Sequence, residues 1–240
     1  MSSINVYEDS KRADSYSKLE FPGTYYLAYR DIPGLLKKHV NGNKAVDFGC
    51  GTGRSTRFLK KYGFDTIGID ISIDMITKAR EFDPAGEYLL IENDNYEKLE
   101  INYYNLVLAG FTFDNIPGKK NRINILGKLK EIINNEGTIV LLDSTPEIYI
   151  NEWASFSTKD YSENKNAASG EKVRIIMKDV EDKRPVEDFI WFHEDYLELF
   201  KQTKLNLVET LKPLGKINEP IEWVNESRIA PWIIYVLKKL

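Results

Sequence analysis

Three glycines at alternate positions, Gly49, Gly51 and Gly53, follow a short apolar segment and precede a second apolar segment that ends at Asp70. Glycines at a strand-to-helix turn let the backbone adopt positive φ and lie close to a ligand, while the next helix offers free N–H groups. A carboxylate at the end of the following strand can accept hydrogen bonds from both hydroxyls of a ribose. These residue types in this order predict a nucleoside site, and the acid favours a ribose without a 2′-phosphate.

The segments around these glycines have the pattern of a β-α-β unit. Residues 45–48 are mostly apolar and suit a strand buried in a parallel sheet. Residues 55–62 place Phe58 and Leu59 among basic side chains, which indicates an amphipathic helix on that sheet. The glycines therefore fall at the carboxyl end of the first strand, where open α/β sheets bind ligands.

The spacing of the glycines separates two classes of nucleotide-binding enzyme. A dinucleotide fingerprint requires a glycine at the position of Arg54, so an enzyme that uses NAD(P) is the weaker alternative. The pattern present, acid-x-Gly-x-Gly-x-Gly beginning at Asp47, resembles the first motif of the class I S-adenosylmethionine (SAM)-dependent methyltransferases. That resemblance implies SAM as the methyl donor and S-adenosylhomocysteine as its product.

The resemblance continues along roughly two thirds of the chain. Ser72 to Arg80 is similar to the helix that follows the acidic strand end in this family, and Glu87 to Leu99 to the third strand and its turn. Tyr104 to Pro117 is similar to the fourth strand and the stretch beneath the transferred methyl group. Ile123 to Ser144 is similar to a helix, a glycine turn and the fifth strand.

The resemblance also implies where the cofactor contacts lie: in the glycine loop, at the ends of the neighbouring strands and in the N-terminal segment. The residues that it assigns to the cofactor are Asp47, Gly49, Cys50, Gly51, Thr52, Gly53, Asp70, Ile71, Met75, Asp94, Asn95, Ala109, Tyr25 and Arg30. Met75 is expected to pack on the adenine, Asp94 to meet its amino group, and Arg30 to pair with the methionyl carboxylate.

The order of predicted elements indicates an α/β fold with a doubly wound, mostly parallel seven-stranded sheet, whose last strand is antiparallel and whose two faces carry helices. We expect four segments. Residues 1–40 form an N-terminal lid, and residues 41–144 form the SAM-binding core. Residues 145–192 are an antiparallel β insertion after strand five, either a substrate cap or a dimerisation hairpin. Residues 193–240 complete the core sheet.

The residues that bind the methyl acceptor are expected in the N-terminal lid and in the insertion. Residues 2–38 are rich in tyrosine, whose rings suit a sulfonium, although these tyrosines could instead cover a sheet edge with Arg30 as a surface charge. Residues 171–180 and 184–192 predict two antiparallel strands above the carboxyl ends of the sheet. The residues predicted to contact the acceptor are Tyr26, Phe111, Trp153, Arg174, Trp191 and Trp223, with Phe156, Tyr161, Asn164 and Arg184 as further candidates.

Methyl transfer from SAM is an in-line displacement, so positioning supplies much of the rate and no obligatory catalytic motif is expected. An acceptor oxygen or nitrogen that carries a proton needs a base, for which His193, Asp114 and Glu226 are candidates. We therefore expect a methyltransferase that acts on a nitrogen or oxygen of a small molecule. A non-catalytic SAM-binding or regulatory domain is the alternative of a different class.

Composition limits the partners. The chain has 240 residues and a net charge of −4, which does not favour a nucleic-acid substrate. One cysteine and two histidines make a dedicated metal site improbable. Without a long apolar run or a signal peptide, we expect no membrane partner, a cytoplasmic location, and a monomer or homodimer.

Overall fold

A computed structural model describes residues 21–92 and 95–240. Its largest element is a seven-stranded sheet in the order β3-β2-β1-β4-β5-β10-β9. The strands are β1 (Lys44–Phe48), β2 (Asp65–Asp70), β3 (Glu87–Leu90), β4 (Tyr104–Gly110), β5 (Ile133–Ser144), β9 (Leu205–Leu211) and β10 (Trp232–Lys239). The first five strands are parallel, and β10 runs antiparallel between β5 and β9. The predicted doubly wound sheet with an antiparallel last strand is confirmed.

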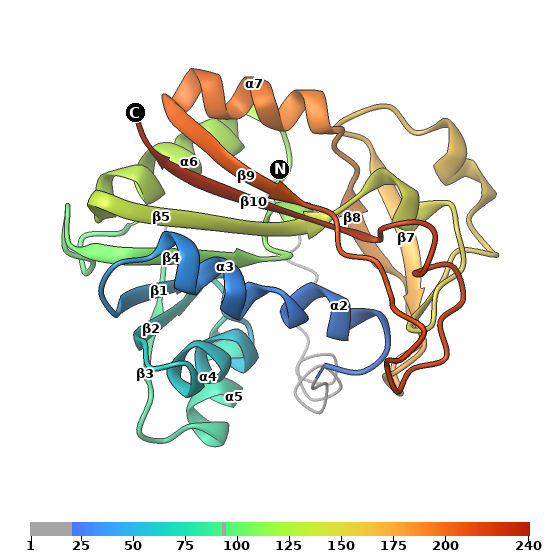
Figure 1. Cartoon of the computed structure of the whole chain (residues 1–240), viewed down its shortest axis with the longest axis horizontal. Helices are drawn as coiled ribbons and strands as arrows, with labels where there is room; N and C mark the ends of the chain where they lie inside the picture. Colours follow the sequence, from blue (N-terminus) through green and yellow to red (C-terminus); the bar gives the residue numbers. More distant parts are fainter. Residues whose placement is uncertain (1–20, 93–94) are drawn as a thin grey trace.

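Helices cover both faces of this sheet (Figure 1). They are α2 (Thr24–Arg30), α3 (Ile32–His39), α4 (Arg54–Lys61), α5 (Ile73–Phe82), α6 (Lys119–Ile132) and α7 (His193–Thr203). Alternate residues of β1 join opposite cores: Ala45 packs with Leu36 of α3 and Leu59 of α4, whereas Val46 shares a core with Leu126 of α6. The period of two along a strand thus explains why the first strand is apolar on both sides.

A second, three-stranded antiparallel sheet follows β5, in the order β6-β7-β8. Its strands are β6 (Phe156–Ser157), β7 (Lys172–Met177) and β8 (Val186–Phe189), and short 3-10 turns η2 (Pro146–Tyr149) and η3 (Ser162–Asn166) precede β7. Figure 1 shows β7 and β8 beyond the end of β5. The predicted antiparallel insertion is therefore present, and it stands at the carboxyl end of the parallel strands.

The passage from α6 to β5 differs from the predicted helix, glycine turn and strand. Here β5 begins directly at Ile133, and the register with β4 shifts between Tyr104 and Leu106. A Cβ on Gly137 would lie 2.9 Å from the carbonyl oxygen of Tyr104, so the backbone at this irregularity needs glycine. In place of the expected glycine turn, β5 contains an irregularity at Gly137, where its register with β4 shifts.

A buried glutamate ties the N-terminal helix to the last loop. Glu226 is fully buried; its Oε1 accepts hydrogen bonds from Thr24 Oγ1 (2.7 Å) and Ala154 N (2.7 Å), and its Oε2 accepts them from Val224 N (2.9 Å) and Asn225 N (3.1 Å). Both oxygens are thus used inside the protein. The structure corrects the proposal of Glu226 as a base.

We expect Glu226→Ala to lower the free energy of unfolding by about 3–5 kcal/mol, because it leaves several buried donors without an acceptor. Urea denaturation followed by circular dichroism measures this change. Glu222→Ala is the matched control, since Glu222 is exposed in the same loop and its truncation is expected to change stability by less than about 0.5 kcal/mol. Equal unfolding midpoints for the two variants would show that the buried hydrogen bonds contribute nothing net.

Candidate functional site

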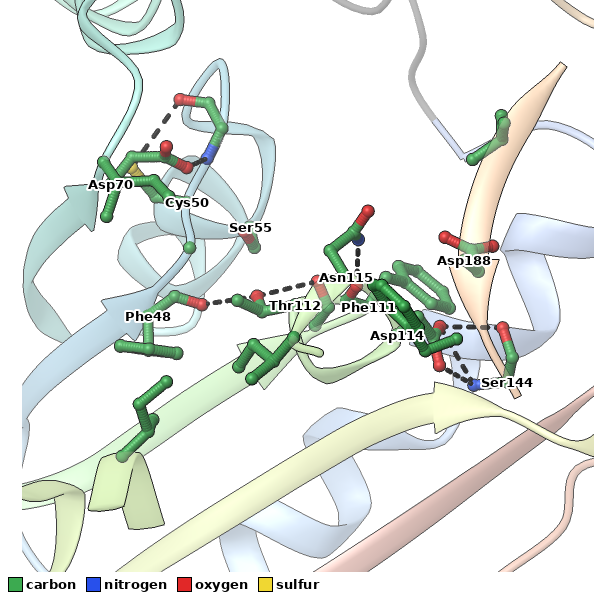
Figure 2. A pocket seen from close by; sticks show the side chains of 18 of the residues that line it. Phe48, Cys50, Ser55, Asp70, Phe111, Thr112, Asp114, Asn115, Ser144 and Asp188 are labelled. Carbon is green, nitrogen blue, oxygen red and sulfur yellow. Dashed lines mark hydrogen bonds between the residues drawn. The ribbon is translucent and has the colours of Figure 1, made fainter. Parts of the chain in front are cut away.

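A cleft of about 1630 Å³ lies at the carboxyl ends of the parallel strands. Its walls come from the β1–α4 loop, the ends of β2 and β4, helices α2 and α6, the start of the insertion, and strands β7 and β8. We name its two parts by their residues: the glycine end holds Gly49, Gly51 and Asp70, and the hairpin end holds Asp114 and Asp188 (Figure 2). The volume exceeds that of a usual single-ligand pocket, so the cleft has room for two molecules side by side.

The glycine end is built from backbone in the left-handed region. Gly49 has φ 69° and Gly51 has φ 52°. A Cβ on Gly49 would lie 2.3 Å from Thr112 Oγ1, whereas a Cβ on Gly51 would meet no heavy atom within 4 Å. Gly49 is therefore required by a neighbour within the protein, while Gly51 leaves its backbone open to the cleft.

Asp70 is held at the end of β2 by the loop beside it. Its Oδ2 accepts a hydrogen bond from Gly51 N (2.8 Å), and its Oδ1 accepts one from Ser72 N (2.9 Å). Burial raises the pKa of this carboxyl above its usual range, and the backbone N–H groups of Ser72, Gly51 and Ile71 oppose that rise. The carboxylate is thus fixed in direction where a ribose would lie.

Asp47 lies beneath the glycine loop instead of in the cleft. It is fully buried, and its Oδ2 accepts hydrogen bonds from Ser55 Oγ (2.7 Å) and Thr56 Oγ1 (2.6 Å) at the start of α4. Burial raises its pKa to about 6, against the lowering effect of the two hydroxyls. We therefore assign Asp47 to holding the loop on the helix, which corrects its assignment to direct cofactor contact.

At the hairpin end, Asp114 of the 3-10 turn η1 (Phe113–Asn115) meets the end of β5. Its Oδ2 accepts a hydrogen bond from Ser144 Oγ (2.7 Å), and both its oxygens lie within 3.3 Å of Ser144 N. Burial raises the pKa of Asp114 to about 6, while the Ser144 hydroxyl and the positive charge of Arg122 lower it. Such a carboxyl exchanges a proton near neutral pH.

A second carboxyl, Asp143, lies next to this group but outside the cleft lining. It is fully buried, and neither of its oxygens has a hydrogen-bond partner. Burial, and next the negative charge of Asp114, raise its pKa well above its usual range. Asp143 and Asp114 therefore take up and release protons as an interacting pair beside the buried Arg122.

Aromatic rings line the middle of the cleft. The ring of Trp232 lies 4.7 Å from Phe111, 5.6 Å from Phe156 and 5.8 Å from Tyr25, centroid to centroid. We call these four residues the aromatic wall. Phe111 has φ 61°, an uncommon conformation for a side chain of this size, and such strain concentrates at functional sites.

The guanidinium of Arg54 lies beside the aromatic wall, at the start of α4. It is 4.8 Å from the centroid of Tyr25 and 5.7 Å from that of Tyr29. Arg54 lines the cleft near Gly51 and Thr52. Contact with these rings fixes the position of the guanidinium at this edge of the cleft.

Comparison with known proteins places this geometry in a family. Residues 23–210 match a family model described as a methyltransferase domain. This chain belongs to that family. It is a class I, Rossmann-like methyltransferase, and its methyl donor is SAM.

Individual proteins resemble this chain over different lengths. The chain is 25% identical over 213 residues to an uncharacterized protein of Methanocaldococcus jannaschii, covering 78% of this chain and 76% of the relative. The chain is also 52% identical over 49 residues to the ubiquinone biosynthesis O-methyltransferase of Methylococcus capsulatus. That shorter match covers 20% of this chain and 21% of that enzyme. The solved structure of the CcbJ methyltransferase from Streptomyces caelestis shares the fold, with a TM-score of 0.66, 17% identity and 99% of both chains covered.

Part of the residue set predicted for the methyltransferase cofactor is brought together in the cleft. The predicted cofactor residues that line it are Tyr25, Gly49, Cys50, Gly51, Thr52, Asp70, Ile71 and Met75. Gly53 and Ala109 are outside the lining; a Cβ on Gly53 would lie 2.6 Å from the Tyr88 hydroxyl, and Ala109 is fully buried in β4. Asn95 is exposed and bonds Glu97 instead. Asp94 falls outside the described residues.

The structure also corrects the assignment of Arg30. Its guanidinium contacts Asp31 (2.7 Å) and Glu219 (2.6 Å), and it does not line the cleft. With two carboxylates already paired to it, Arg30 is committed to holding the last loop. Arg54 is the arginine that lines the cleft beside the glycine loop.

Of the six residues first predicted to contact the acceptor, Phe111 lines the cleft, and of the further candidates Phe156 and Arg184 do. Trp153 is fully buried and donates to Ile148 O, Trp191 stacks on Arg122, and Tyr26 packs near Trp223. Arg174 pairs with Glu163 at the surface. These four aromatic side chains support the insertion and the last loop, and the prediction that they contact the acceptor is corrected.

His193 is likewise turned away from the cleft. Its Nδ1 lies 2.9 Å from the Tyr235 hydroxyl, and its ring stacks on that of Tyr235 at 5.6 Å. Of the three proposed bases, Asp114 is the one that lines the cleft.

Other cleft residues were not predicted. Among them are Arg54, Ser144, Tyr149, Asp188 and Trp232. A signal existed for Asp188: it lies two residues after Val186 in a strand, so the two side chains share a face. The short segment gave no means of telling which face is the inner one.

The two glycines of the loop give a paired prediction. Alanine at Gly49 collides with Thr112, whose Oγ1 is held on Phe48 O, so we expect Gly49→Ala to lower the melting temperature. Alanine at Gly51 costs only the roughly 1–2 kcal/mol of a left-handed residue, but its methyl group enters the cleft and lowers SAM affinity. Differential scanning fluorimetry and calorimetry measure the two effects. SAM affinity unchanged in Gly51→Ala would show that the cofactor does not approach this backbone.

Proposed function

We propose that this enzyme transfers the methyl group of SAM to a nitrogen or oxygen of a small-molecule acceptor. The observation that carries the proposal is the single cleft that joins the open backbone of Gly51 and the carboxylate of Asp70 to the buried carboxyl of Asp114. SAM fits the glycine end, because a nucleoside needs backbone without Cβ and a strand-end acid. The open cleft also favours an enzyme over a non-catalytic SAM-binding domain.

Each residue of the glycine end would contact a different part of the donor. Asp70 would accept hydrogen bonds from the ribose hydroxyls, Ile71 and Met75 would contact the adenine, and Arg54 would pair with the methionyl carboxylate. When bound, SAM supplies a methyl group activated on a sulfonium. The rings of Tyr25 and Tyr29 exclude water beside that charge without adding a nucleophile.

Asp114 would accept the proton that the acceptor loses. Its pKa of about 6 leaves the carboxylate ionised at neutral pH and still basic enough to take a proton. The hydrogen bond from Ser144 fixes its direction. No step on this route needs a metal ion.

Residues 145–192 serve in this proposal as the acceptor cap, in preference to a dimerisation hairpin. Their support is that Phe156, Ile175, Met177, Val186 and Asp188 all line the cleft. A sheet whose side chains wall the cavity beside the donor is well placed to select the acceptor.

Calorimetric titration tests the proposal. We expect SAM and S-adenosylhomocysteine to bind with one site per chain, and NAD to give no heat. The donor site is formed by the β1–α4 loop and the end of β2. We therefore expect SAM to bind in the absence of an acceptor. Absence of binding by both SAM and its product would refute the proposed function.

A further inference from the structure

Arg122 of α6 is the one arginine or lysine that is buried among residues 21–92 and 95–240. Its side chain is fully enclosed, whereas Lys120 and Lys128 on the same helix are exposed. Taking a guanidinium out of water costs several kcal/mol unless buried acids and carbonyls meet it with good geometry. The contacts of Arg122 therefore indicate what this buried charge does.

Two nitrogens of the Arg122 guanidinium donate to the backbone on either side of Asp114. Nε donates to Ile116 O at 3.0 Å, and Nη2 donates to Phe113 O. Asp114 lies between these two carbonyls, in the 3-10 turn η1. Because the guanidinium is planar and rigid, the two hydrogen bonds fix the turn at both of its ends.

The side chain of Asp114 is held from the opposite direction by β5. Ser144 donates to the carboxylate from its hydroxyl and from its backbone N–H, as the dashed lines in Figure 2 show. Burial raises the pKa of Asp114, and the Ser144 hydroxyl and the positive charge of Arg122 oppose that rise. The other titratable groups around this carboxyl are Asp143 of β5, Tyr149 of η2, Asp188 of β8, which accepts from Tyr149, and Tyr196 of α7. Arg122 is the one cation of this set.

The same guanidinium joins η1 to α7 and to the end of the insertion. Its Nη1 donates to the Tyr196 hydroxyl of α7 at 3.0 Å, and its Cζ lies 4.3 Å from the ring centroid of Trp191. Trp191 is the second residue after the end of β8 and lies between the insertion and α7. Arg122 is therefore held by two later segments of the chain while it holds the turn that carries Asp114.

We propose that Arg122 is a positioning residue for methyl transfer: its guanidinium clamps the η1 turn and so fixes the Asp114 carboxylate that takes the proton of the acceptor. This inference rests on the proposed function, in which Asp114 is the base. Arg122 does not line the cleft, so it acts through the turn and through its charge.

Substitution by lysine or by methionine separates these two effects. Arg122→Lys keeps a positive charge but cannot donate as a rigid fork to both carbonyls. Arg122→Met loses the charge and the fork, and its flexible apolar side chain adapts to the space that the arginine leaves. Loss of a nearby positive charge raises the pKa of Asp114, because that charge favours the carboxylate. Entry of water into a loosened site would lower the pKa instead, because burial is what raises it.

Two measurements on the full chain without ligand test the clamp. The first is an infrared pH titration of the carboxyl absorbance that Asp114→Asn removes. We expect its midpoint near pH 6 in the unmodified chain and in Arg122→Lys, and a rise of about one pH unit or more in Arg122→Met. The second is hydrogen exchange of the Asn115 and Ile116 amides, which donate to Thr112 O and Phe113 O. We expect exchange to be about 10-fold faster or more in both variants.

Lys120→Met is the matched control, because Lys120 is exposed on the same helix and does not line the cleft. We expect this variant to give the midpoint and the exchange rates of the unmodified chain. A midpoint that stays or falls in Arg122→Met refutes the proposal, since a merely structural arginine would give that result. Exchange in Arg122→Lys within about threefold of the unmodified rate also refutes it, and decides the matter if Arg122→Met does not fold.

Titration of the unmodified chain with S-adenosylhomocysteine is the separate test of the function on which the inference rests. If S-adenosylhomocysteine does not bind, the proposed function is refuted whatever the two measurements give. If it binds and either measurement fails as described, the clamp is refuted and the donor site stands.

Discussion

Asp70→Ala is expected to weaken SAM binding by about 100-fold or more. A carboxylate that accepts two ribose hydroxyls contributes charge-assisted hydrogen bonds worth about 1.5–3 kcal/mol each. The same carboxylate also orients the loop, because it accepts hydrogen bonds from Gly51 N and Ser72 N. Truncation therefore removes ligand contacts and loosens the backbone that must approach the ligand.

Calorimetry with S-adenosylhomocysteine measures this loss. Asp65→Ala is the matched control, because Asp65 lies at the opposite end of the same strand, where it is exposed and pairs with Lys44. We expect that variant to bind as the unmodified chain does. If Asp70→Ala bound within about threefold of it, the ribose would have to be held elsewhere in the cleft.

The central sheet and the glycine loop were predictable because local sequence determines them. Strands that are apolar on both sides, glycines at a strand end and an acid at the next strand end each report a backbone or burial requirement of the fold. Gly49 illustrates this: its φ of 69° and the contact with Thr112 exclude a side chain. Such requirements can be inferred from the local sequence without knowledge of the rest of the molecule.

Most residues predicted to contact the methyl acceptor were wrong, because the type of an aromatic or charged residue does not indicate the direction of its side chain. Trp153 and Trp191 lie in the insertion as expected but pack behind the cleft, whereas Trp232, at the start of the last strand, lines it. Arg30 and Arg54 show the same limit: each is an arginine near tyrosines, and only the fold shows that Arg30 pairs with Glu219. Partners distant in sequence decide these roles.

Asp114→Asn is expected to lower kcat by about 100-fold, because a positioned general base contributes roughly 10²–10⁴-fold. The asparagine keeps the shape of the side chain and its contact with Ser144, so the loss reports proton transfer more than folding. The sign of the pH dependence follows from the raised pKa. Below about pH 6 the Asp114 carboxyl is protonated and cannot take a proton, so the rate should fall about tenfold per pH unit on the acid side.

The matched variant is Asp143→Asn. Burial and the negative charge of Asp114 raise the pKa of Asp143 well above its usual range, and a neutral amide of the same shape replaces its protonated form. We expect Asp143→Asn to keep the acid limb near pH 6 and Asp114→Asn to abolish it. The measurement is the pH–rate profile of S-adenosylhomocysteine release with an acceptor that the unmodified enzyme methylates. If the fall in rate at low pH persisted in Asp114→Asn, the group that titrates would be the acceptor itself. Asp114 would then contribute to binding of the acceptor and not to proton transfer.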